Sequence, residues 1–412
     1  MTGTRRRVVY LDQSAQLSGA QLAMLRLLPA LAPWVDARVV VAEDGPLVAR
    51  LEGVGVATEV LPMAQATREV RCEHLRPGGV GLAGAAGAAS YVARLTRRLR
   101  RLRPALVHTN SLKAAIYGGL AARAAGAPVI WHIRDRITPD YLPAPAVAVV
   151  RAMARRLPDA VLGNDTTLPT LGTCPRPRFS VADPVDPRCF DARRRATVEP
   201  SPLRVGMVGR ITPWKGQDVF LTAFARAFTG SEAVAVVVGA PLFGEHEYER
   251  QLHALVGRLG IADRVEFRGF REDIPAELAA LDVFVHSSIL PEPFGQVVTE
   301  AMAAGLPVVA SDAGGPSLII TDGTDGLLTP PRDVDALASA LRRLASDPTL
   351  RASLGEAARR SARRFSADAA AQRVLEAYRT VLTAHQAGRE PLSSWPEPRA
   401  ADEDLLLLGE SG

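Results

Sequence analysis

Short apolar runs, many of them rich in valine, alternate along the chain with longer segments in which apolar residues recur at helical spacing. Near-continuous apolar runs of this length are typical of strands that are buried on both faces of a parallel sheet. The first half of the chain therefore predicts an α/β arrangement of alternating strands and helices. Strands are expected over residues 8–11, 38–42, 58–61, 105–107, 129–132 and 160–162, and helices over 20–31, 47–52, 88–102 and 112–125.

The alternation stops in a stretch that is rich in proline, and then it begins again. Asp183-Pro184, Asp186-Pro187 and Pro200-Ser201-Pro202 are typical of turns and linkers, so this stretch is expected to join two domains. Beyond it, strands are expected over 204–208, 233–238, 264–267, 283–286, 307–310 and 326–328, and helices over 216–228, 248–259, 296–304, 334–344 and 367–385.

This pattern predicts two tandem, Rossmann-like, doubly wound α/β domains that face each other across a cleft. In such sheets, ligands bind at the carboxyl ends of the strands, where loops lead into helices. That architecture alone does not name a reaction. The expected boundaries are 1–182 for the first domain, 183–203 for the linker, 204–366 for the second domain, 367–388 for a helix that packs back toward the first domain, and 389–412 for a disordered polar tail.

The composition is that of an ordinary globular protein, with 47% hydrophobic and 23% charged residues among 412. No segment approaches the roughly 20 apolar residues that a membrane-spanning helix needs. The apolar run after the first arginines is too short for the core of a signal peptide, so we expect a cytoplasmic protein. The three cysteines are far apart and lack metal-ligand spacing, which favours reduced, structural thiols.

The first candidate site is the loop that follows the predicted strand 204–208. Gly209 permits a tight turn, and Arg210 and Lys215 place two positive charges near the start of the next helix. A helix N-terminus favours anions through its unpaired N–H groups and its dipole, so cations beside it would form a pocket for a diphosphate. Lys215 is one of two lysines among 49 basic residues, the other being Lys113. A solvated loop with incidental charges explains the same residues.

A second candidate site lies one strand later. Glu292 is in a loop, Gly295 opens the following helix, and Glu300 lies inside that helix. Amide groups near Gly295 can approach a phosphate closely, and carboxylates accept hydrogen bonds from the paired hydroxyls of a sugar or ribose. The alternative is that Glu300 only complements the helix dipole and that Glu292 is a surface charge.

A third loop, after the predicted strand 307–310, carries Gly314-Gly315, whose glycines permit close backbone approach. Taken in order, the three loops resemble those of the retaining glycosyltransferases of family 4, which have the GT-B fold. The resemblance extends from about residue 8 to 385 and is densest over 205–328. Its elements are the Gly-Arg…Lys-Gly loop at 209–216, the Glu-x7-Glu motif at 292–300, the Glu-Ala-Met-Ala-x-Gly-x-Pro-Val-Val segment at 300–309 and the Gly-Gly turn.

The resemblance implies a role in donor binding for each matching residue of the second domain. Glu292 would lie beside the transferred sugar as a catalytic residue, and Glu300 would bind the ribose hydroxyls. The remaining positions are Arg210, Lys215, Phe294 and Gly295 at the diphosphate, and Gly269 and Phe270 near the base.

The first domain matches the family less closely. Leu17 to Gln21 resembles the family's Gly-rich first loop, in which Gly19 would face the donor phosphates. The strand 129–132 ends at His132, which matches the family's active-site histidine and would be catalytic. A lone histidine at a strand end is otherwise more often a structural residue. The resemblance also points to an acceptor pocket, lined by His108, Asn110 and Lys113.

Three positions depart from the family pattern. Gln21 stands where many members have glutamate, and Asp183-Pro184 replaces Asn-Gly at the hinge. Leu318 replaces the glutamate of the family's Gly-Gly-x-x-Glu, so no carboxylate contact is expected there.

The family implies transfer of a hexosyl group, with retention, from a UDP- or GDP-sugar to a saccharide, lipid-linked or small-molecule acceptor. We expect no metal and no other cofactor, because the sequence has no Asp-x-Asp element in a suitable loop and because Arg210, Lys215 and helix N-termini could stabilise the leaving diphosphate. No nucleic-acid partner is expected. Two alternatives stay open, namely a non-hydrolysing nucleotide-sugar epimerase of the same fold and a non-catalytic homologue that binds sugar nucleotides.

An arginine-rich segment, residues 94–103, is relevant to whether the protein contacts a membrane. It contains six arginines and no acid, and Leu95, Leu99 and Leu102 recur in it at helical spacing. One interpretation is a domain helix with leucines in the core and solvated arginines. The other is peripheral contact with an anionic membrane at its inner face, which agrees with the sequence pI of about 9.4.

Overall fold

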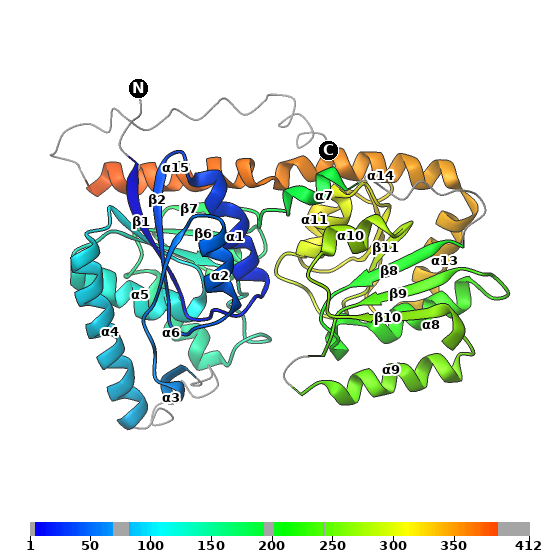
Figure 1. The fold of residues 1–412 in the computed structure, drawn as a ribbon, viewed down its shortest axis with the longest axis horizontal. Helices are drawn as coiled ribbons and strands as arrows, with labels where there is room; N and C mark the ends of the chain where they lie inside the picture. Colours follow the sequence, from blue (N-terminus) through cyan, green and yellow to red (C-terminus); the bar gives the residue numbers. More distant parts are fainter. Residues whose placement is uncertain (1–4, 69–81, 193–201, 242–243, 386–412) are drawn as a thin grey trace. The chain divides into compact units, whose positions relative to one another are not determined.

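The computed structural model describes residues 5–68, 82–192, 202–241 and 244–385 (Figure 1). It divides the chain into two compact units. The first contains the chain as far as Pro184 and again from Ala367 onward, and the second is Val185–Ser366. The expected tail, residues 386–388 of the expected last helix, residues 193–201 of the expected linker and Cys72 lie outside the described residues.

The first unit is built on a parallel seven-stranded sheet with the strand order β3-β2-β1-β4-β5-β6-β7. The order reverses between β1 and β4, which makes their carboxyl ends the topological switch point where ligands of such sheets bind. The strands are β1 (Arg6–Asp12), β2 (Val35–Val41), β3 (Ala57–Val60), β4 (Leu106–Thr109), β5 (Val129–Ile133), β6 (Ala160–Gly163) and β7 (Arg178–Ser180). The helices are α1 (Gly19–Leu31), α2 (Pro46–Gly53), α3 (Gln65–Arg68), α4 (Leu82–Leu102), α5 (Leu112–Ala125), α6 (Ala144–Ala154) and α15 (Ala367–His385).

Side chains that alternate along β1 enter different cores on the two faces of this sheet. Val9 and Leu11 pack in a cluster with residues of α4 and α5. Val8 and Tyr10 pack in a second cluster, which includes residues of α1 and α15. Because strand side chains alternate with a period of two, both faces of the strand are apolar and both are covered. The last helix of the chain is therefore part of the core of the first unit (Figure 1).

The second unit has a parallel six-stranded sheet with the order β10-β9-β8-β11-β12-β13 and its switch point between β8 and β11. The strands are β8 (Arg204–Val208), β9 (Val234–Val238), β10 (Val265–Gly269), β11 (Val283–His286), β12 (Val308–Ser311) and β13 (Leu327–Thr329). The helices are α7 (Pro187–Asp191), α8 (Gln217–Ala227), α9 (His246–Arg258), α10 (Ile274–Ala279), α11 (Gln296–Ala303), α12 (Gly315–Ile319), α13 (Val334–Ser346) and α14 (Pro348–Ala362).

The predicted fold class, two tandem doubly wound α/β domains, is confirmed, although the sequence pattern missed several elements. The strand β7 has three residues, none of them fully buried, so it has no apolar run. The helix α14 buries mostly small residues, which give a weak periodic signal. The helix α7 lies inside the stretch that was expected to be a linker, where Asp186 caps it by accepting a hydrogen bond from the Arg188 amide.

The arginine-rich segment 94–103 forms the end of α4 and the residue that follows it. Leu95, Leu99 and Leu102 are buried in the core of the first unit, so they are not free to enter a lipid layer. Arginines of this segment form ion pairs with acidic side chains or donate hydrogen bonds to backbone carbonyls. Arg98 pairs with Glu59, and Arg100 donates to the carbonyl of Ala124. No helix in the described part of the chain combines the length and apolar character that crossing a membrane requires.

Candidate active site

The loops that follow β8 and β11 pack against each other at the switch point of the second sheet. Gly216, at the start of α8, has a φ of 70°, and a Cβ added to it would lie 2.1 Å from the carbonyl oxygen of Ser287. Only glycine fits this conformation and this contact. The backbone of Gly216 therefore brings the loop 209–216 against the end of β11.

The Gly-Gly turn packs against the loop that follows β11 and contains Glu292. Gly314 forms a β-bridge with Glu292, and the amide of Gly315 donates to the carbonyl of Glu292 over 2.9 Å. A Cβ added to Gly315 would lie 1.7 Å from the carbonyl oxygen of Phe294. All three loops that the sequence singled out thus meet around Glu292.

Glu292 is buried and accepts hydrogen bonds from three side chains at one carboxylate oxygen. Lys215 Nζ lies 2.5 Å from Glu292 Oε1, and His286 Nε2 lies 2.7 Å from the same atom. The hydroxyl of Ser288 donates to it as well. Burial alone would raise the pKa of Glu292, but the charges of Lys215 and His286 outweigh it and hold this pKa well below its usual range. Glu292 is therefore a carboxylate at neutral pH.

The two cations among the predicted diphosphate-binding residues, Arg210 and Lys215, are each paired with an acid in the structure. Arg210 Nε lies 3.4 Å from Glu245 Oε2, and Lys215 is bound to Glu292. The indole ring of Trp214 lies next to both cations, with Lys215 Nζ 4.6 Å from its centroid and the guanidinium carbon of Arg210 5.9 Å away. Cations over an indole ring are stabilised by its negative face. Trp214 thus helps to hold the two charges side by side.

The other donor-side candidates lie on the elements that the motif requires. Gly295 caps α11 with a φ of 101°, and Phe294 before it is buried against Phe365. Glu300 is buried within α11. Gly269 ends β10 with a φ of 65°. Phe270, the next residue, is 66% exposed, so its ring is accessible for stacking on a ligand.

At the switch point of the first unit, a buried polar network joins three strand ends. Asn110, after β4, donates to Asp12 Oδ2 over 2.8 Å, and Gln21 donates to the same oxygen over 3.0 Å. Arg134, after β5, donates to Asn110 Oδ1 over 3.2 Å and is paired with Asp183. The predicted acceptor residue Asn110 is therefore held on both sides of its amide. Gln21, where many family members have glutamate, serves as a donor to Asp12.

His108 and His132 lie in contact beside this network. His108 Nε2 is 3.1 Å from His132 Nδ1, and His108 Nδ1 is 2.7 Å from the hydroxyl of Tyr378. Both rings are buried, and both nitrogens of His108 are engaged. His108 is therefore placed as a partner of His132. The other two candidates of this unit lie at helix starts, Gly19 exposed at the beginning of α1 and Lys113 half-buried in the first turn of α5.

Four residues at the switch point of the second unit were not identified from the sequence. They are Trp214, Glu245, His286 and Ser288. His286 and Ser288 lie at the carboxyl end of β11, and polar residues at the end of an otherwise apolar strand are a signal that could have found them. Glu245 lies outside every motif, and only the fold brings it to Arg210.

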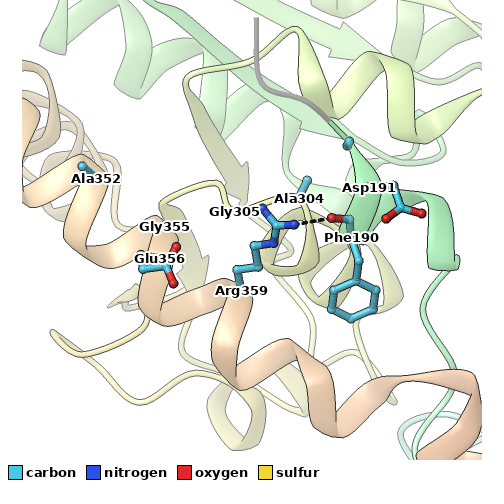
Figure 2. A pocket seen from close by; sticks show the side chains of 9 residues that line it. Phe190, Asp191, Ala304, Gly305, Ala352, Gly355, Glu356 and Arg359 are labelled. Carbon is cyan, nitrogen blue, oxygen red and sulfur yellow. Dashed lines mark hydrogen bonds between the residues drawn. The ribbon is translucent and has the colours of Figure 1, made fainter. Parts of the chain in front are cut away.

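Among the described residues, no group of three or more histidine, cysteine, aspartate or glutamate side chains is arranged to hold a metal ion. Independence from metals stays a prediction. A hollow of about 460 Å³ elsewhere on the second unit contains none of the candidate residues. It lies between α7, the end of α11 and α14, where Arg359 donates to the carbonyl of Phe190 over 2.5 Å (Figure 2).

Comparison with known proteins gives matches for both units. Residues 18–168 match the model of the glycosyl transferase 4-like domain, and residues 191–361 match that of the glycosyl transferases group 1. Among solved structures, HepE of Anabaena in complex with UDP and glucose superposes with a TM-score of 0.78 at 28% identity. That match covers 90% of this chain and 99% of HepE, which has also been crystallised with UDP-glucose.

Curated relatives match over a shorter range. The D-inositol 3-phosphate glycosyltransferase of Streptomyces avermitilis is 38% identical over 210 residues, which is 49% of this chain and 45% of that protein. The lipopolysaccharide core biosynthesis glycosyltransferase LpsE of Rhizobium meliloti is 40% identical over 127 residues, 30% of this chain and 37% of LpsE. The match thus spans less than half the length of these relatives.

The two doubly wound sheets, with loops that converge at the switch point of the second, define a protein of the GT-B class. Within that class, the matches of its two units to the glycosyl transferase 4-like domain and to the glycosyl transferases group 1 make the chain a family 4-like protein.

Proposed function

We propose that this protein is a retaining glycosyltransferase that uses a nucleoside-diphosphate sugar, with a UDP-sugar as the first donor to test. The observation that carries the proposal is the ion pair of Lys215 with Glu292, which brings the Gly-Arg…Lys-Gly loop together with the Glu-x7-Glu motif. The complexes of HepE with UDP and UDP-glucose support the choice of base.

Arg210 and Lys215 would stabilise the charge that develops on the diphosphate as the bond to the sugar breaks. Both lie on the loop that enters α8, and Trp214 holds them next to each other. Fixed cations in a partly dry site stabilise such a charge far more than mobile water does. Their present partners, Glu245 and Glu292, would then share them with the phosphate oxygens.

Glu292 would orient the transferred sugar. Its Oε1 accepts from Lys215, His286 and Ser288, whereas no hydrogen bond to Oε2 is found in the described part of the chain. An ionised carboxylate oxygen is an acceptor for a sugar hydroxyl. Glu300 on α11 would bind the ribose, and the exposed ring of Phe270 would stack on the base.

The acceptor would bind on the first unit, near His132. A saccharide, lipid-linked or small-molecule hydroxyl fits the proposal. The buried network of Asp12, Asn110 and Arg134 would fix the shape of this region rather than bind the acceptor directly, since its polar groups already bond one another.

The test is a panel of UDP- and GDP-sugars, incubated with the purified protein with and without candidate acceptors and with EDTA. Release of the nucleoside diphosphate, faster with an acceptor, is the expected result. NMR of the product would then show an unchanged anomeric configuration. Conversion of the nucleotide sugar into its epimer without release of diphosphate would identify an epimerase instead. Loss of turnover in EDTA would overturn the expected independence from metals.

A further inference from the structure

His286 is the last residue of β11, a strand that pairs with β8 on one side and with β12 on the other. Val283 and Val285 of this strand enter the apolar core of the second unit. Because side chains alternate along a strand, His286 projects from the opposite face. Its side chain is buried, and its partner in the register of β12 is Ala310. The imidazole is therefore carried by a strand that is held from both sides, at the end where ligands of such sheets bind.

The contact between His286 and Glu292 shows which ring nitrogen carries a proton. His286 Nε2 is 2.7 Å from Glu292 Oε1, and an oxygen of an ionised carboxylate can only accept. Nε2 is therefore a donor, whether the ring is neutral or charged. The hydroxyl of Ser288 donates to the same carboxylate oxygen and lies 3.1 Å from His286 Nε2. Two donors from the end of β11 thus converge on one oxygen of Glu292.

The other ring nitrogen gives no structural reason for a histidine at this position. His286 Nδ1 is buried and has no hydrogen-bond partner in the described part of the chain. An unpaired buried polar atom costs free energy, and an apolar side chain at the end of this apolar strand would avoid that cost. The bonds of Nε2 to Glu292 and Ser288 are therefore what distinguishes histidine from an apolar residue here.

Lys215, the third donor to Glu292, is held less firmly than His286. Its ammonium is carried by a flexible four-carbon stem from a different loop, whereas the imidazole lies one carbon away from a central strand. The proposed function also gives Lys215 a second ligand, the donor diphosphate. When Lys215 is shared with a phosphate, its bond to Glu292 weakens, but the bonds from His286 and Ser288 do not depend on it.

The backbone of Glu292 is fixed independently of its side chain. Gly314 forms a β-bridge with it, and the amide of Gly315 donates to its carbonyl over 2.9 Å. The side chain is held at Oε1, where the donors converge. With the backbone and Oε1 both fixed, the place of Oε2 is fixed as well, and this is the oxygen that is left to accept from a substrate hydroxyl.

We propose that His286 is a positioning residue, which holds Glu292 Oε1 through its Nε2–H so that Oε2 stays directed at the transferred sugar when Lys215 binds the diphosphate. Ser288 assists from the same side. His286 acts through Glu292 and does not touch the substrate. The role in transfer rests on the proposed function, whereas the hold of His286 on Glu292 is a property of the protein without ligands.

The hold on Glu292 is measured on the full chain without substrate, by NMR correlation of ring nitrogens and protons after labelling histidine with ¹⁵N. The protein has seven histidines, so the signals of His286 are assigned by their loss in His286→Gln. We expect a proton on Nε2 whose signal changes in Glu292→Ala, because its acceptor is then absent. An Nε2 without a proton, or a signal that is the same in Glu292→Ala, would overturn the proposal.

A matched pair of variants, His286→Gln and His286→Met, tests the role in transfer. The amide nitrogen of glutamine is as many bonds from Cα as Nε2 of histidine, and methionine has a similar length without a donor. His286→Met should lower kcat roughly 10- to 100-fold, the usual effect of losing a hydrogen bond to a charged group. UDP affinity should stay within a few-fold of wild type, because UDP lacks the sugar, and His286→Gln should recover most of kcat. Equal kcat in the two variants, or a UDP affinity that falls together with kcat, would refute positioning.

Circular dichroism would show whether the variants fold. If His286→Met does not, His286→Asn takes its place, because its amide is one bond shorter than that of glutamine and does not reach Glu292, and the same outcomes decide.

Addition of UDP to the labelled protein tests whether His286 keeps its hold when Lys215 binds a diphosphate. The Nε2–H signal of His286 should persist, and a shift to its position in Glu292→Ala would refute the proposal. A protein whose His286 bonds Glu292 but which transfers no sugar would refute the proposed function and leave the hold on Glu292 intact. An active transferase with the same kcat in His286→Gln and His286→Met would refute only the positioning role.

Discussion

Lys215 Nζ lies 2.5 Å from Glu292 Oε1, and this pair joins the loop that enters α8 to the loop that enters α11. A buried carboxylate and a largely buried ammonium each cost free energy when unpaired, and the pairing of Glu292 with Lys215 offsets this cost. A diphosphate that binds at Lys215 would therefore change the surroundings of Glu292 as well. The two residues should be studied together.

Lys215→Ala and Arg210→Ala should each reduce the affinity for the donor and the rate of transfer. The loss of a fixed cation next to the developing charge typically costs roughly 3 kcal/mol, or about 10²-fold in rate. UDP affinity by calorimetry and kcat/KM with the active donor measure both effects. The control is Arg226→Ala, which removes an exposed cation at the other end of the same helix, where it pairs with Asp335 over 2.6 Å. Values within a few-fold of wild type for both test variants would contradict the role in diphosphate binding.

Glu300→Gln and Glu292→Gln should have different effects. Glu300→Gln is expected to weaken UDP binding, because an amide is a poorer acceptor for the ribose hydroxyls than a carboxylate. Glu292→Gln is expected mainly to lower kcat, because Glu292 would contact the transferred sugar, which UDP lacks. Calorimetry with UDP separates the two, and an equal loss of UDP affinity would argue against this division of roles.

Gly216→Ala and Gly230→Ala form a matched pair. Both glycines have a positive φ, 70° and 68°, where an alanine costs roughly 1–2 kcal/mol. A Cβ at position 216 would also lie 2.1 Å from the Ser287 carbonyl oxygen, whereas at position 230 there is open space. We expect Gly230→Ala to lose stability without loss of UDP affinity, and Gly216→Ala to lose both. Equal UDP affinity in the two variants would show that the packing of the two loops does not matter for the donor.

The buried histidines should make the first unit sensitive to mild acid. The pKa of His108 is about 3 in the fold and about 6.5 in the unfolded chain, so between these values the unfolded chain binds the extra proton. The stability from a neutral His108 is therefore complete above pH 6.5 and decreases as the pH falls toward 3, by about 1.4 kcal/mol per pH unit. His108→Gln should reduce this slope.

Hydrogen exchange of the amides of β4 and β5 at pH 6.5 and 5.0 measures the effect in the first unit. The amides of β8 and β11 serve as the internal control, because they belong to the second unit. A slope for β4 and β5 that is the same in wild type and variant would mean that His108 is not the proton-binding group.

Contact with an anionic membrane is a separate proposal, and the burial of Leu95, Leu99 and Leu102 restricts it to electrostatic binding. Such binding should be strong at low salt and lost at high salt. Sedimentation with phosphatidylglycerol vesicles tests it, with Arg97, Arg101 and Arg103 changed to glutamine. A variant with equal charge loss on the second unit, at Arg250, Arg258 and Arg360, is the control. Wild-type protein that stays in the supernatant at low salt would refute docking.

The sequence predicted the strands and loops of the second unit well because their signals are local. The apolar run 283–286 and the glycines around Glu292 require a buried strand, a turn and a helix start in that order. The first unit was harder. The bonds of Asp12 to Asn110 and of His108 to Tyr378 join residues about 100 and 270 positions apart, and no local pattern reports such contacts.

The difference between local patterns and contacts of residues far apart in the sequence also applies to Arg210 and Lys215. The positions of Arg210 and Lys215 beside a helix start follow from the sequence. Their pairing with Glu245 and Glu292 depends on the strand order, which places β9, the strand before Glu245, on one side of β8 and β11, the strand before Glu292, on the other.

The place of α15 has a consequence for synthesis on the ribosome. The face of the first sheet that carries Tyr10 and Leu106 is complete only when α15 has emerged, and all of Val185–Ser366 is translated in between. At ordinary elongation rates this takes on the order of tens of seconds. During that interval the nascent first unit exposes an apolar surface, and a chain that stopped at Ser366 would never cover it. The newly made protein is then a natural client for chaperones that bind apolar segments at the exit tunnel.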